Sequence, residues 1–101
     1  MAIDLFCYSS LPLLEVQKVL STFHIQHPEL FSGHFLISEV SQLTEVEKEI
    51  ALGHGLLAQC LFLIRVNNKS ELGLMPTVID IVKNTLNNSN VVILFENEER
   101  R

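Results

Sequence analysis

One run of apolar residues constrains the fold more than any other feature: residues 60–64 read Cys-Leu-Phe-Leu-Ile without a polar interruption. Successive side chains of a strand point to opposite faces of a sheet, so a run that does not alternate needs cover on both faces. The run therefore predicts a central strand. Arg65 follows it and begins the return of the chain to solvent.

Three further segments have the composition of strands. Residues 2–8 carry bulky apolar side chains and end at Ser9-Ser10, while residues 91–95 read Val-Val-Ile-Leu-Phe after a cluster of Asn and Ser. Residues 35–40 are apolar but include Ser38 and Glu39, so this strand is expected to be partly exposed.

Two segments have the 3–4 residue apolar spacing of helices. The first, residues 11–26, starts after Ser10 as an N-cap with Pro12 in the first turn, and ends before the His27-Pro28 junction. The other, residues 75–86, opens at Pro76 and is closed by residues 87–90, which are Asn and Ser.

A shorter helix is predicted to start at Thr44. Thr44 and Glu47 have the spacing of a capping box, in which side chain and backbone cap each other. The apolar residues at helical spacing, expected to face inward, are Leu43, Val46 and Ile50. Glycines at positions 53 and 55 end the helix.

The element order is β-α-β-α-β-α-β, without repeats or a dividing linker, and predicts one α/β domain over residues 1–101. Helical crossovers favour parallel neighbouring strands, so a four-stranded sheet with helices packed on it is the first expectation. If the short helix after Thr44 is only an insertion between strands, the same order gives a ferredoxin-like α+β sandwich.

Composition excludes several functional classes. The apolar fraction of 48% indicates a folded chain, and a net charge of −5 argues against a surface that binds nucleic acid directly. Residues 1–6 lack the basic start of a signal peptide, and no apolar stretch approaches the ~20 residues of a membrane span. The sequence predicts a cytoplasmic protein without membrane contact and without a cofactor.

The residues that could bind metal do not have the spacing of a site. Cys7 and Cys60 are far apart and have apolar neighbours, so both are predicted to be buried free thiols. His24 and His27 could supply two ligands near a helix end, but a site needs at least a third. No metal site is predicted.

Candidate catalytic residues are equally sparse. Ser9 and Ser10 follow the first strand but do not lie in a G-x-S-x-G turn, and no glycine-rich phosphate loop follows any strand. Asp4 lacks the acidic cluster and lysine that would accompany a phospho-acceptor. The sequence therefore predicts that the protein is not an enzyme.

Acidic residues are concentrated in the middle of the chain. Residues 29–49 hold five glutamates against one cation, Lys48. Such a segment is either a solvated helix face or a docking surface whose charge speeds encounter with a basic protein. The candidate binding residues are Glu39, Glu45, Glu47 and Glu49.

Four segments of the chain resemble small immunity proteins of bacterial contact-dependent growth inhibition systems. They read IDLFCYSSL at residues 3–11, HPELF at 27–31, FLISE at 35–39 and LFENEE at 94–99. The resemblance implies a cytoplasmic protein that binds the C-terminal toxin domain delivered by a neighbouring cell and blocks its active site.

In that family many toxins are nucleases, whose basic clefts would suit an acidic inhibitor. A different class remains open from the residues alone. The chain could be a small regulatory or ligand-binding α/β domain that forms a homodimer through an exposed strand edge.

Overall fold

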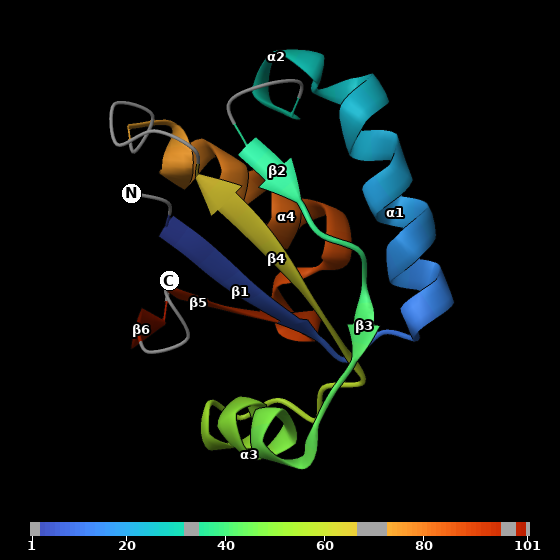
Figure 1. The fold of residues 1–101 in the computed structure, drawn as a ribbon, viewed down its shortest axis with the longest axis vertical. Coiled ribbons are helices and arrows are strands. Elements are labelled where there is room, and N and C mark those ends of the chain that lie inside the picture. Colours follow the sequence, from blue (N-terminus) through green and yellow to red (C-terminus); the bar gives the residue numbers. More distant parts are fainter. Residues whose placement is uncertain (1–2, 32–34, 67–72, 96–98, 101) are drawn as a thin grey trace.

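The central strand is β4 (Cys60–Val66), which pairs along its whole length with β1 (Ile3–Ser9). Its other edge pairs with two short strands, β2 (Phe35–Ile37) and β3 (Ser41–Gln42). The central position predicted for the apolar run is confirmed, because β4 is paired at both edges. The computed structural model describes residues 3–31, 35–66, 73–95 and 99–100 (Figure 1).

All the strand pairs of the described residues are antiparallel. Beyond β1 the sheet continues with β5 (Val91–Phe95) and β6 (Glu99–Arg100), in the order β2-β4-β1-β5-β6. The expected sheet of four main strands with helices packed on it is confirmed. The expected parallel pairing is wrong: β1 and β2 run in the same direction, but β4 lies between them.

This order of the four longer strands is that of the ferredoxin-like α+β sandwich, the alternative that the sequence left open. The reason is that α3 (Glu45–Gly53) is an insertion in the connection from β2 to β4, rather than a crossover helix. After α3 the chain enters β4, which lies between β2 and β1 and pairs with both.

Helices cover the two sheet faces unequally. The helices α1 (Leu13–Gln26), α2 (Pro28–Phe31) and α4 (Met75–Leu86) lie on one side, and α3 lies alone across one end of the sheet (Figure 1). In the described part of the chain, no helix is long and apolar enough to cross a membrane.

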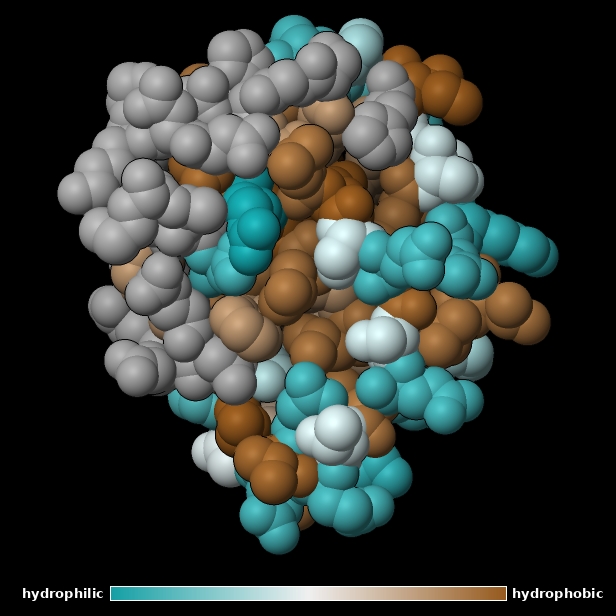
Figure 2. Space-filling view, viewed as in Figure 1, coloured by the Kyte–Doolittle hydropathy of each residue, from teal (hydrophilic) through white to brown (hydrophobic). Residues whose placement is uncertain are grey.

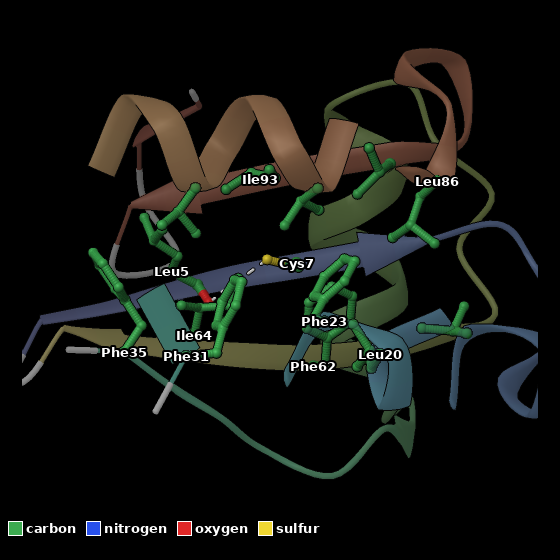
Figure 3. Packing of buried hydrophobic residues seen from close by; sticks show 14 of the residues in the cluster. Leu5, Cys7, Leu20, Phe23, Phe31, Phe35, Phe62, Ile64, Leu86 and Ile93 are labelled. Carbon is green, nitrogen blue, oxygen red and sulfur yellow. Dashed lines mark hydrogen bonds between the residues drawn. The ribbon is translucent and has the colours of Figure 1, made fainter. Parts of the chain in front are cut away.

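The main core lies between the sheet and the helices α1, α2 and α4 (Figure 3). Alternate residues of each strand point into it, which is why β4 supplies every second side chain of its apolar run. Its largest members are fully or almost fully buried: Leu5, Phe23, Phe31, Phe35, Phe62, Ile64, Leu86 and Ile93.

A smaller second cluster lies on the opposite face, beneath α3. Its buried members are Tyr8, Ala51, Leu56, Leu61, Val92 and Leu94. The two clusters together explain the uninterrupted apolar run of β4, because Leu61 packs under α3 while Phe62 faces the main core. The exposed side chain of Arg65 marks where the cover of the second face ends.

The strand predicted at residues 35–40 is shorter in the structure, ending at Ile37. Ser38 interrupts it: the backbone N–H of Leu63 donates to Ser38 Oγ at 2.8 Å, and Ser38 N–H donates to Leu63 O at 2.9 Å. Val40 then turns inward and is buried, and pairing resumes at β3. This edge of the sheet is therefore divided into two short pieces.

The start of α1 differs from the prediction that Ser10 is its N-cap. The N-cap is Pro12 and has no side-chain hydrogen bond. Ser10 Oγ instead lies 3.4 Å from both Asn90 O and Asn90 Oδ1. The end of α4 is as predicted: Asn87 adopts a positive φ of 74° and leads into the short 3-10 helix η2 (Asn88–Asn90).

Both cysteines are free and fully buried, as predicted. Cys7 Sγ lies 3.9 Å from Leu5 O, and Cys60 Sγ lies 3.5 Å from Leu11 O. Burial penalises the charged thiolate, which raises the pKa of Cys7 strongly and that of Cys60 to about 11. Neither thiol is therefore reactive in the folded protein.

The buried thiols should make stability fall at high pH. An exposed cysteine of the unfolded chain ionises near about pH 8.5, while the folded thiols keep their protons. Since the folded pKa values are raised, the stabilisation is complete below that pH and is lost as pH rises towards about 11. Urea unfolding at about pH 8 and about pH 10.5 measures this loss.

The double variant Cys7→Ala/Cys60→Ala is the control. It should be less stable than wild type at neutral pH, because each lost thiol leaves a small void, but should lose less stability on going to alkaline pH. An equal fall in both proteins would show that other groups cause the pH dependence.

Candidate functional site

The four glutamates selected from the sequence do not form one cluster. Glu39 lies in the connection between β2 and β3, and the other three lie on α3. Glu39 is exposed and lines a hollow of about 220 Å³ with residues of α1, among them Gln17 and Ser21. It belongs to a different part of the surface from α3.

Glu47 has a structural role within α3. The backbone N–H of Thr44 donates to Glu47 Oε1 at 2.9 Å, and the N–H of Glu47 donates to Thr44 Oγ1 at 3.2 Å. This is the predicted capping box, which satisfies two of the unpaired N–H groups at the helix start. The carboxylate of Glu47 is thus already engaged by its own helix, and its side chain is half-buried.

The buried side of α3 differs from the prediction. Val46, expected to face inward, is 65% exposed, whereas Ala51 is fully buried. The helix rests on the line formed by Glu47, Ile50 and Ala51, and Val46 lies about a quarter turn away from it. The sequence pattern favoured Val46 because it is larger and more apolar than alanine.

Glu45 and Glu49 lie on the side of α3 that faces away from the sheet. They are four residues apart, so their side chains share one face of the helix. Lys48 Nζ lies 3.6 Å from Glu45 Oε1, and both side chains are largely in solvent, at 55% and 90% exposed. Such an exposed pair contributes little to stability.

The same face of α3 carries a shallow hollow of about 260 Å³. Its lining combines charged and apolar side chains from α3 and from the segment that follows: Glu45, Lys48, Glu49, Leu52, Leu57 and Ala58. Leu52 is 57% exposed and Leu57 is 78% exposed. We call these six residues the α3 patch.

A second exposed surface, which the sequence did not indicate, lies on the part of the sheet that α3 leaves uncovered. Arg65 Nε and Nη2 donate to the two carboxylate oxygens of Asp4 at 2.9 and 3.2 Å. Together with Leu36 and Leu63 they line a hollow of about 240 Å³. Figure 2 shows hydrophobic surface over the middle of this side of the molecule, with hydrophilic side chains beside it.

The carboxylate of Asp4 is occupied by its ion pair with Arg65. The paired carboxylate raises the pKa of Arg65, first through the hydrogen bonds and second through charge. The two hydrogen bonds join the planar guanidinium of Arg65 to the carboxylate of Asp4 in a bidentate fork. The signal in the sequence, an acid and a base on two separate strands, becomes visible only once β1 and β4 are placed in register.

Ser9 and His27, which the sequence singled out, make contacts within the fold, and the side chain of His24 lies outside the described part of the structure. Ser9 Oγ accepts a hydrogen bond from the N–H of Leu11 at 3.1 Å, and Ser9 is fully buried. His27 ends α1 and packs edge-on against Phe23 and Phe31, with ring centroids 6.5 Å apart in both cases. Among the described residues, no three His, Cys, Asp or Glu side chains are grouped so that they could hold a metal.

Comparison with known proteins assigns the chain to a family. The family model described as "CDI System Immunity Component" matches residues 1–99. "Immunity protein CdiI-2" of Burkholderia pseudomallei strain 1026b is 43% identical over 101 residues, covering the whole of both chains.

The fold agrees with a solved relative. A chain of the "CdiA-CT/CdiI toxin and immunity complex from Burkholderia pseudomallei" matches with a TM-score of 0.92 and 41% identity, over 97% of this chain and 95% of that one. The resemblance seen in the sequence is therefore confirmed, and the chain belongs to the family of immunity components of contact-dependent growth inhibition (CDI) systems.

Proposed function

We propose that this protein binds the toxin domain of its own growth-inhibition system in the cytoplasm and neutralises it by covering the active site. As a member of an immunity family, the chain is not itself an enzyme. The observation that carries the proposal is the solved relative, which was determined in a complex of toxin and immunity protein and shares this fold. Protection by such a protein is stoichiometric, since each copy occupies one toxin.

We further propose that the toxin is a nuclease. A nuclease attracts phosphate groups and is basic around its cleft. This chain has a net charge of −5 and presents Glu45 and Glu49 on the outward face of α3. Carboxylates at that position can pair with the cations that would otherwise hold the phosphates of the substrate.

The residues proposed to contact the toxin are Glu39, Glu45, Glu47 and Glu49. They differ in how accessible their carboxylates are to a partner. Glu45 and Glu49 are exposed together and Glu39 is exposed elsewhere, so all three can meet a partner. Glu47 would have to leave the capping box to form a full ion pair, at a cost of about 1 kcal/mol of helix stability. Charge reversal is therefore most informative at Glu45 and Glu49.

The first test is a titration. The purified toxin domain of the same growth-inhibition system is assayed on tRNA and on plasmid DNA with increasing amounts of the immunity protein. We expect nuclease activity to fall linearly and to end at one equivalent, because inhibition requires occupation of each toxin molecule. Protection at a small fraction of one equivalent would instead indicate destruction of the toxin. A toxin domain that stops cell growth but cleaves neither nucleic acid would contradict the proposal of a nuclease.

The mass of the free protein and of the complex in solution tests the homodimeric regulatory domain that the sequence left open. We expect a monomer that forms a 1:1 complex with the toxin. The short, divided edge formed by β2 and β3 offers few consecutive backbone groups for pairing with a second copy. A stable dimer that does not bind the toxin would favour the regulatory alternative.

The second test reverses charge on α3. The double variant Glu45→Lys/Glu49→Lys should bind the toxin at least about tenfold more weakly at low salt, chiefly through slower association. Its free energy of unfolding should stay within about 0.5 kcal/mol of wild type, because both side chains are exposed. Binding kinetics and urea unfolding measure the two effects separately.

Glu15→Lys is the matched control, since Glu15 is an exposed acid in the first turn of another helix, α1. It changes the net charge by half as much but leaves α3 intact. Wild-type affinity of the α3 double variant at low ionic strength, with a loss of affinity in Glu15→Lys, would move the toxin-binding surface from α3 to α1.

A further inference from the structure

The α3 patch contains two leucines that are exposed to solvent and pack in neither buried cluster. Leu52 and Leu57 are 57% and 78% exposed, and they lie in the same hollow. Single exposed leucines are ordinary, but two that line the same hollow form an apolar patch that a partner can cover.

The backbone holds Leu57 outward. Leu56, the residue before it, is buried in the second cluster, and its N–H donates to Ala51 O at 3.0 Å. The N–H of Gly55 donates to Leu52 O at 2.9 Å, and Gly55 has a φ of +85°, which glycine adopts without strain. Since this turn is fixed at both ends, Leu57 is presented to solvent in a defined position rather than on a free loop.

The charges of the α3 patch are not balanced internally. Lys48 lies beside Glu45, and in the described part of the chain Glu49 has neither an ion pair nor a side-chain hydrogen bond. The patch thus offers one uncompensated carboxylate next to two apolar side chains. A basic residue complements this arrangement, because its methylene stem can pack on leucine while its cation meets the carboxylate.

The uncovered sheet face is less suited to a basic partner. Leu36 is 53% exposed there, but the neighbouring Asp4 is already paired with Arg65 through two hydrogen bonds. A cation arriving at this surface would have to compete with Arg65 for that carboxylate. Charge complementarity therefore favours the α3 patch.

We propose that Leu52 and Leu57 are the apolar anchors of the toxin interface and that they receive the stem of an arginine or lysine of the toxin domain, whose charged end pairs with Glu49. This inference rests on the proposed function and deepens it by naming the contact. The carboxylates guide and orient the encounter, and burial of the two leucines slows dissociation.

The test compares exposed leucines on different faces of the protein. The double variant Leu52→Ala/Leu57→Ala should dissociate from the purified toxin domain at least about tenfold faster, equivalent to about 1.4 kcal/mol, while its association rate changes by less than about threefold. Leu14→Ala on α1 and Leu36→Ala on the sheet face are matched controls, since their side chains are 69% and 53% exposed. Both controls should bind as wild type does.

Urea unfolding of each variant confirms that the fold is retained, as expected for exposed positions. Unchanged dissociation of Leu52→Ala/Leu57→Ala overturns the inference, and faster dissociation of Leu36→Ala alone moves the anchor to the sheet face. If wild-type protein does not bind the toxin domain at all, the proposed function itself fails. The two failures are therefore distinguishable by the wild-type measurement.

Discussion

Burial of β4 on both faces and pairing at both edges is the constraint on which the other elements depend. Its side chains alternate between the main core and the second cluster, and its backbone connects β1 with β2 and β3. Each fully buried side chain of this size contributes about 1.5–3 kcal/mol. The helices α1 and α4 cover one face, which leaves α3 as the cover for part of the other.

This arrangement separates the stabilising residues of α3 from its outward residues. Ala51 and Ile50 attach the helix to the sheet, and Thr44 and Glu47 cap its start. Glu45 and Glu49 make no contact that the fold requires. Substitutions on the outward face can therefore alter charge and binding while the helix keeps its position.

The sequence was most informative where local chemistry decides the structure. The capping box of Thr44 and Glu47, the buried run of β4 and the end of α4 before Asn87 each depend on residues close together in the chain. Strand direction was mispredicted because it depends on which strand fills the place beside β1, a matter of long-range pairing. The Asp4–Arg65 pair and the division of the edge at Ser38 were missed for the same reason.

Counting acids along the chain also could not separate the roles of the glutamates on α3. Glu45, Glu47 and Glu49 are all within five residues, yet one caps the helix and two extend into solvent. The distinction follows from the helical repeat, which turns Glu47 towards the sheet and the helix start.

A surface that combines solvated carboxylates with leucines held by a fixed turn has two separate means of controlling a complex. Long-range charge acts on the rate of encounter, and short-range apolar contact acts on the rate of release. Raising the salt concentration should therefore weaken the first and leave the second, which makes ionic strength the variable that resolves the contributions of the two kinds of residue.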